Sequence, residues 1–485
     1  MADGTAKLPL GTKLAYGFGS AAYGIKDGGF SYFLLMFYGT VVGLDQGLVG
    51  LAILIALVVD AFSDPLVGYW SDNFRSKWGR RHPFMYAAAA PIALTYFLLW
   101  NPPDWGQTGL FCYLLALAIL IRTLITFYET PSSALLPELT QNYQERTTVQ
   151  TWRLFFGWAG GNFMAILMWG VLLVATAQYK EGSLNREGYE TYGIIASLLI
   201  FVAIMVSALG THSHIKHLRK PPERERRSLA SIFREMFDTL REDSFKALFF
   251  TMLFGSVATG FGAALAFQML SFFWGFEPAQ IFIWTMLVFV SALIALLIAP
   301  RLVKAFGKKK SVIGIGMIAF TIAPMPVLLR LLDVMPQNGD PMLFPIVAAV
   351  NTLDLGLIIA FQAIAYSMIA ELVEQSELRT GRRSEGVFYA AVTFTRKSSQ
   401  GIGAAVAGFG LAFIAFPQGE AVSSVSDEKL WYLGAIYAPI LWVLWGSMLF
   451  AISRYRIDED SHEANLRELA ARADKVEERA GSDIL

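Results

Sequence analysis

The chain has 485 residues, of which 55% are hydrophobic and only 16% are charged, and its formal net charge is zero. A soluble protein carries roughly 25% charged residues, so this composition excludes an ordinary soluble domain. The balanced charge gives no indication of nucleic-acid binding, and Cys112, the only cysteine, excludes an intrachain disulfide. The charges cluster between long apolar runs, which is typical of a helical protein that crosses the membrane many times.

Twelve apolar segments follow one another along the chain. Their approximate spans are 14–42, 47–71, 84–101, 108–137, 150–177, 191–210, 245–274, 279–300, 311–332, 343–373, 384–416 and 428–452. An apolar helix of about 20 residues crosses the hydrocarbon core of a bilayer. We therefore predict an all-α membrane protein with twelve transmembrane helices.

Lysine and arginine predict the orientation of these helices. If both termini are cytoplasmic, the tails and the even-numbered loops hold 30 of the 39 Lys and Arg residues, and the opposite side holds four. This asymmetry satisfies the positive-inside rule. The long basic loop 211–243 then divides an N-terminal six-helix bundle, 1–210, from a C-terminal one, 244–452, and a charged cytoplasmic tail follows at 453–485.

The two halves resemble each other in sequence. The segment "PELTQNYQERT" (137–147) ends the fourth span and "AELVEQSELRT" (370–380) ends the tenth, so their Glu-Leu and Arg-Thr pairs recur at an offset of 233 residues. A weaker pair is "GYWSDNFRSKWGRR" after the second span and "PRLVKAFGKKK" after the eighth. Two related six-helix halves are typical of a transporter that binds its substrate between them.

Ionisable residues at membrane depth are costly without a partner or a function. Asp60 and Asp64 lie four residues apart, so a helix presents both on one face, where they repel each other. A sodium ion or a proton would remove the repulsion, and Lys397 is an alternative neutralising partner. A purely structural pairing of the acids with Arg153 or Lys397 is the other interpretation. The whole set is Lys26, Asp27, Asp60, Asp64, Arg122, Glu129, Arg153, Asp354, Arg396 and Lys397.

Several motifs extend over the whole transmembrane body. They are "KLAYGFGSAAYGIKD", "DAFSDPLVGYWSDNFRSKWGRRHPF", "TFYETPSSALLPELT", "WRLFFGWAGG", "MIAELVEQSE" and "RSEGVFYAAVTFTRKSSQG". Together they resemble the glycoside–pentoside–hexuronide:cation symporters, the family of the bacterial melibiose permease. The resemblance implies the major facilitator superfamily fold, with two six-helix bundles, and cation-coupled symport of a sugar or glycoside by alternating access.

The resemblance also implies roles for individual residues. The implied cation site is Asp60, Asp64, Thr126 and Glu129. The implied substrate site is Lys26, Asp27, Glu129, Arg153, Thr393 and Lys397. Because Glu129 belongs to both sets, one carboxylate stabilised by both ligands would make the binding of each favour the other.

Ser133 departs from the pattern of the family, since melibiose permease has at this position a tryptophan on which a pyranose ring stacks. A sugar would need another ring here, such as Tyr23, Tyr128 or Phe156. A lysolipid-like amphiphile, carried by another branch with this signature, does not need the ring and is the alternative substrate. A third reading, a sensor or enzyme on a transporter scaffold, predicts loss of the two acids of the second span, yet both are present.

The basic loop after the second span predicts a cytoplasmic gate. Its charges can pair with helix ends of the other half and separate as the bundles rock; alternatively, they only determine the topology. The predicted gating residues are Asp72, Arg75, Arg80, Arg81, Glu371 and Glu374.

No nucleophile–base pair or metal-ligand spacing indicates catalysis. We therefore expect no enzyme activity, no cofactor and no metal beyond the coupling ion, Na+ or H+. The predicted partners are a small-molecule substrate, a monovalent cation and the lipid bilayer, without nucleic acid, and we expect a monomer. The predicted location is the plasma (cell inner) membrane.

Overall fold

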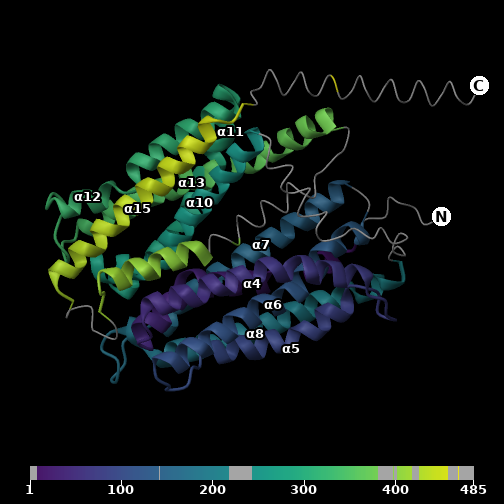
Figure 1. The fold of residues 1–485 in the computed structure, drawn as a ribbon, viewed down its shortest axis with the longest axis horizontal. Helices are drawn as coiled ribbons and strands as arrows, with labels where there is room; N and C mark the ends of the chain where they lie inside the picture. The colour runs from purple at the N-terminus through teal and green to yellow at the C-terminus, as the bar shows by residue number, and fades with distance from the viewer. Residues whose placement is uncertain are drawn as a thin grey trace, which may run out of the picture. The chain divides into compact units, whose positions relative to one another are not determined.

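The structure, a computed structural model, describes residues 8–140, 143–217, 243–380, 397, 401–417, 425–456 and 468. Every regular element in these residues is a helix (Figure 1). Each of the twelve predicted spans contains helical residues, although only 397 and 401–413 are described as helical in the eleventh. The prediction of an all-helical membrane fold is therefore confirmed.

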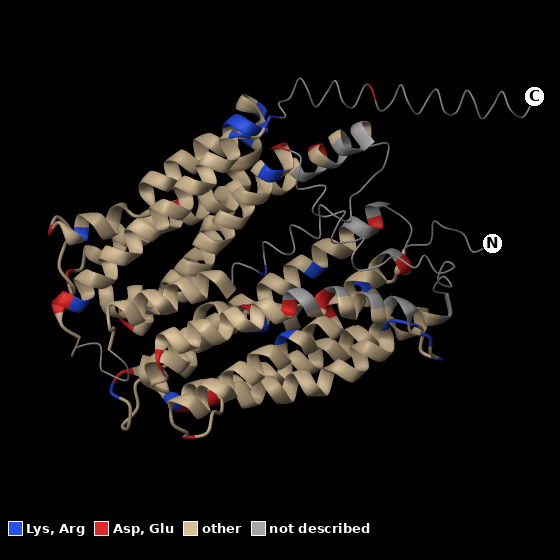
Figure 2. Ribbon diagram, in the orientation of Figure 1, with Lys and Arg blue, Asp and Glu red and all other residues tan. Residues whose placement is uncertain are grey.

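Eight helices of the described residues are long and apolar enough to cross a membrane, and Gln46–Asp60 and Gly401–Phe413 are shorter apolar helices. The predicted eighth and ninth spans are two helices that meet within α11 at a sharp kink at Gly307, a residue with a non-helical backbone conformation (φ 72°). In Figure 2 most of the helical ribbon carries neither basic nor acidic residues. This is the distribution that a helix in hydrocarbon requires.

The N-terminal helices include breaks and short π-helical or 3-10 segments. They are α1 (Leu10–Phe18), α2 (Ser20–Gly28), η1 (Gly29–Phe33), α3 (Leu34–Met36), η2 (Phe37–Val41), α4 (Gln46–Asn73), α5 (His82–Leu99), α6 (Gln107–Leu139), α7 (Tyr143–Leu167), η3 (Met168–Leu172), η4 (Gly182–Leu184), α8 (Arg186–His212) and η5 (Ser213–His217). The later elements are α10 (Asp243–Ala264), η6 (Gln268–Phe273), α11 (Pro278–Ile322), α12 (Met325–Leu331), α13 (Leu343–Thr380) and α15 (Asp427–Ser453).

Contacts divide the chain into two compact units, which are described separately. The first unit is Met1–Arg226, Gly260–Thr285 and Gln400–Leu433, and the second is Arg227–Thr259, Met286–Ser399 and Gly434–Leu485. This grouping assigns parts of the seventh, eighth, eleventh and twelfth spans to the first unit. The division into bundles 1–210 and 244–452 stays a prediction.

In the first unit, α4 packs along α6, α5 lies against both α6 and α8, and α2 packs along α7. The side chain of Asp45 begins α4 by accepting a hydrogen bond from the backbone N–H of Leu48 at 3.0 Å, and caps of this kind satisfy the free N–H groups of a first turn. The packing of α4 on α6 brings the acids of the second span against the polar residues of the fourth.

Glycines allow α2 and α7 to approach closely. A Cβ at Gly24 would overlap the backbone carbonyl oxygen of Gly157, and a Cβ at Gly160 would lie 3.0 Å from the Cα of Ala21. Small residues at helix interfaces permit such backbone contact in membranes. The close approach holds Arg153 of α7 beside the hydroxyl groups of α1 and α2.

Candidate functional site

The two acids of α4 meet α6 at Thr126. Its hydroxyl oxygen lies 2.7 Å from Asp64 Oδ1 and 3.3 Å from Asp60 Oδ1, and it also lies 3.1 Å from the backbone carbonyl oxygen of Arg122. A threonine hydroxyl has one proton to donate, so these three acceptors share it. Asp60 and Thr126 are buried and Asp64 is half-buried. The structure thus brings together three of the four residues predicted for the cation site.

Glu129, the fourth predicted residue, lies three positions after Thr126 on α6, a spacing that places both on neighbouring parts of one helix face. Its half-buried carboxylate attracts the guanidinium of Arg153 on α7 electrostatically. Glu129 therefore lies on the helix that carries Thr126 and acts on a residue predicted to bind substrate.

Arg122 is a further member of this site, and its sequence context predicts no role for it. Its Nη1 lies 3.4 Å from Asp60 Oδ2, and both side chains are almost fully buried. The structure places Arg122 beside Asp60, and Lys397 as a neutralising partner of the acid pair stays a prediction. One signal could have found it: Arg122 precedes Thr126 by four residues, so both lie on one face of α6.

Lys26 and Asp27 of α2 form an ion pair with each other. The Lys26 ammonium is buried and lies 5.9 Å from the centre of the Phe30 ring. An ammonium near an aromatic face is attracted by the ring quadrupole. Two residues predicted to bind substrate are thus held together next to an aromatic ring.

The guanidinium of Arg153 is held by hydroxyl groups. Its Nε lies 3.3 Å from Ser20 Oγ, its Nη1 lies 3.3 Å from Tyr16 Oη, and its Nη2 lies 2.9 Å from Ser133 Oγ. The Tyr16 ring also lies 5.2 Å from the centre of the guanidinium. Ser133, noted in the sequence only because it is not a tryptophan, therefore accepts a hydrogen bond from a predicted substrate residue.

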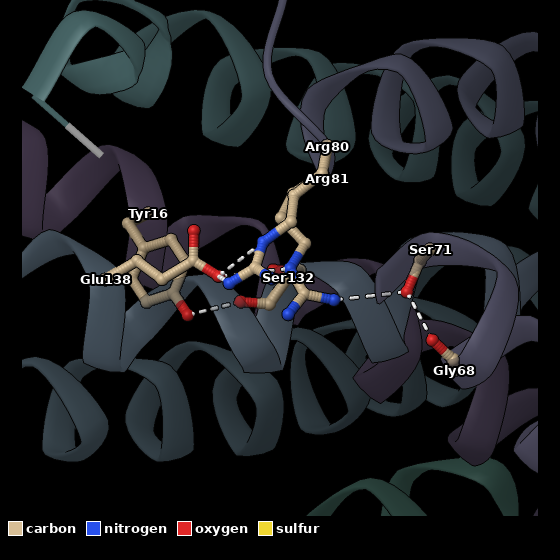
Figure 3. Close-up of polar contacts among 7 residues, drawn as sticks. All are labelled: Tyr16, Gly68, Ser71, Arg80, Arg81, Ser132 and Glu138. Carbon is tan, nitrogen blue, oxygen red and sulfur yellow. Dashed lines mark hydrogen bonds and ion pairs between the residues drawn. The ribbon is translucent and has the colours of Figure 1, made fainter. Parts of the chain in front are cut away.

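A second polar cluster lies where the α4–α5 loop meets the end of α6 (Figure 3). Glu138 Oε1 accepts from Arg80, whose Nε lies 3.1 Å away, and from Arg81 Nε at 3.3 Å. Arg81 Nη1 also donates to Ser71 Oγ at 3.1 Å. Gly79 precedes the arginines with a φ of 73°, a conformation that favours glycine. These arginines contact Glu138 of their own unit, and their pairing with Glu371 or Glu374 stays a prediction.

The second unit contains a corresponding arrangement. Lys308 Nζ lies 2.8 Å from Glu371 Oε1, and Tyr455 Oη donates to Glu371 Oε2 at 2.8 Å. Burial, with the nearby charge of Glu371, raises the pKa of Tyr455 and keeps its hydroxyl protonated. Gly307 precedes Lys308 with a φ of 72°, as Gly79 precedes Arg80. Glu138 and Glu371 are also separated by the 233-residue offset of the sequence repeat, so the repeat extends to the geometry of the two clusters.

The remaining predicted residues are less fully described. Arg75 is exposed and Lys397 is half-buried. Thr393 and the side chains of Asp72 and Glu374 lie outside the described part of the chain. Of the three rings predicted to replace the tryptophan, Tyr128 is buried, and Tyr23 and Phe156 are half-buried.

Comparison with known proteins identifies the family. The family model described as MFS/sugar transport protein matches residues 15–459. The chain is 25% identical to the putative glycoside/cation symporter YagG of Escherichia coli (strain K12), over 96% of this chain and 95% of that protein. It is 23% identical to the isoprimeverose transporter of Lactiplantibacillus pentosus, over 93% and 90% of the two chains.

A solved structure shows a similar fold. It is the partially occluded inward-open conformation of the xylose transporter XylE from E. coli, with a TM-score of 0.59 and 13% identity over 93% of this chain and 98% of that one. Family match, helical architecture and fold agree with the sequence prediction of a transporter rather than an enzyme. The chain belongs to the MFS/sugar transport protein family and is a multi-pass membrane transporter of the major facilitator superfamily.

Proposed function

We propose that this transporter carries a sugar or glycoside across the membrane together with Na+ or H+, by alternating access. The observation that carries the proposal is the meeting of Asp60 and Asp64 at the hydroxyl of Thr126, within a chain of the sugar-transport family. Relatives named as glycoside/cation symporter and isoprimeverose transporter support the substrate class.

The proposed cation site uses the oxygens of Asp60, Asp64, Thr126 and Glu129. Hard cations are bound by oxygen ligands, and intramembrane acids also serve as proton carriers. The proposed substrate site lies around Lys26, Asp27 and Arg153, with Glu129 shared between the two. Carboxylates supply acceptors and guanidinium and ammonium groups supply donors, which is the combination that sugar hydroxyls require.

The proposed gates are the two cytoplasmic clusters, around Glu138 in the first unit and Glu371 in the second. We place the chain in the cell inner membrane with both termini cytoplasmic, because the loops that carry most of the Lys and Arg residues then lie on the cytoplasmic side. As the bundles 1–210 and 244–452 rock, each cluster moves as part of its own bundle and exchanges partners with the other bundle.

Uptake into inverted or right-side-out membrane vesicles tests the proposal. A panel of radiolabelled glycosides and pentosides, with a lysolipid as the alternative substrate, is offered under an imposed Na+ gradient or an imposed pH gradient. We expect uphill accumulation of at least one sugar with one of the two gradients, and none with the Asp64→Asn variant. Accumulation of the lysolipid alone, or of the sugars without either gradient, would contradict the proposal.

A further inference from the structure

Arg122 is an unusual arginine. Its side chain is 1% exposed, and of its nitrogen atoms Nη1 alone has a hydrogen-bond acceptor among the described residues, Asp60 Oδ2 at 3.4 Å. The Nε and Nη2 atoms are buried without an acceptor in that part of the chain. The guanidinium instead faces Phe30, whose ring centre is 5.4 Å away and which Lys26 also approaches.

Arg153 is a second buried arginine of this unit, and its guanidinium is fully hydrogen-bonded, unlike that of Arg122. Arg153 is 5% exposed, and all three of its nitrogen atoms have hydroxyl partners within 3.3 Å. Strong pairs between arginine and a carboxylate are frequently bidentate, with two parallel N–H bonds. Arg122 reaches Asp60 through one long contact and leaves buried donors unmatched, which is unfavourable. Its ion pair with Asp60 is therefore suited to the exchange of Arg122 for another cation rather than to a permanent structural contact.

The charges of the first unit give a reason for such an exchange. Among the residues that the structure describes in this unit, four acids and three bases lie at membrane depth, which are Asp27, Asp60, Asp64, Glu129, Lys26, Arg122 and Arg153. The set has one net negative charge, and one monovalent cation neutralises it. Without Arg122 the same acids would attract a cation more strongly, because Asp60 would lose its competing positive partner.

We propose that Arg122 is a resident counter-cation, which the coupling ion displaces from Asp60 and whose unmatched N–H groups then receive oxygen atoms of the substrate. The inference deepens the proposed function and rests on it. A displaced guanidinium without acceptors is costly in a buried site, so the ion takes Asp60 easily only when the substrate supplies acceptors. Arg122 thereby makes the binding of ion and substrate cooperative, and the cooperativity is reciprocal.

Cation binding to the purified protein without substrate tests the first half of the inference. Thermal stability is followed as NaCl replaces choline chloride at constant ionic strength, and separately as pH is lowered without Na+. The other ionisable groups of the site, Lys26 on α2, Asp64 on α4 and Glu129 on α6, are unchanged in every variant. For the ion that acts on the wild type, Arg122→Gln should lower the half-saturating concentration by about tenfold or more.

Three further variants keep the test decisive. Arg122→Met retains an unbranched apolar stem and should behave like R122Q, which it replaces if R122Q does not fold. Arg122→Lys retains the charge and should stay close to wild type. Arg186→Gln removes an arginine whose partners, Asp104 and Glu190, lie outside the proposed sites, and it should leave the half-saturating concentration unchanged. A wild-type cation affinity in the folded R122Q or R122M variant, or no response of that variant to either ion, overturns the inference.

The proposed cooperativity between ion and substrate is tested with the sugar that the vesicle screen identifies. This sugar should lower the half-saturating cation concentration of the wild type but not of R122Q, and an equal effect on both proteins overturns the role of Arg122 in coupling. Wild-type vesicles without gradient-driven uptake would defeat the proposed function itself. Gradient-driven wild-type uptake with unchanged cation affinity in R122Q would defeat only this inference.

Discussion

Replacing Glu138 with glutamine removes the charge that holds two arginines of the α4–α5 loop. The side chains of Glu138 and Arg81 are 10% and 6% exposed, and that of Arg80 is 19% exposed, so solvent screens these contacts only partly. A hydrogen bond to a charged group contributes about 1.5–3 kcal/mol. Glutamine keeps one acceptor oxygen, and we therefore expect the loop and the end of α6 to lose about 2 kcal/mol of local stability.

Backbone hydrogen exchange measures this loss directly. A change of about 2 kcal/mol corresponds to roughly 30-fold faster opening, so amides within residues 71–86 should exchange roughly 30-fold faster in Glu138→Gln. The matched control is Glu190→Gln, because Glu190 accepts from Arg186 Nε at 3.2 Å on the same helix but is 37% exposed. An exposed pair of this kind contributes less than about 0.5 kcal/mol, about twofold in exchange. Equal exchange in E138Q and wild type would refute the reasoning.

Three other predictions concern the site and the packing that supports it. Asp60→Asn and Asp64→Asn should each abolish gradient-driven accumulation in vesicles while the protein still inserts; normal accumulation in both would remove them from the cation site. Asp27→Ala should lower substrate affinity in calorimetric titration by roughly tenfold to over a hundredfold and leave cation affinity intact, and a loss of both in folded protein would contradict its substrate role. Gly24→Ala should prevent folding or lower the melting temperature strongly, because its Cβ would overlap a carbonyl oxygen of α7, whereas Gly28→Ala, with 3.5 Å to the nearest atom, should melt like wild type.

The sequence alone determined the membrane architecture, because burial in lipid requires long apolar helices and restricts where charges can lie. It also determined which residues share a helix face, since spacing along one helix decides this without knowledge of any neighbour. Asp60 and Asp64 are about one turn apart in any helix. The 233-residue repeat that relates Glu138 to Glu371 is likewise present in the amino-acid sequence. The resemblance of the motifs to the symporter family implied the predicted roles of these residues in binding the cation and the substrate.

Only the tertiary structure decided which side chains meet across helices. Asp60 lies beside Arg122, the loop arginines contact Glu138, and Ser133 accepts a hydrogen bond from Arg153. Such pairings depend on how far each helix is rotated and shifted against its neighbour. That register is set by packing, as where Gly24 lets α2 approach α7, and no spacing within a single helix contains it.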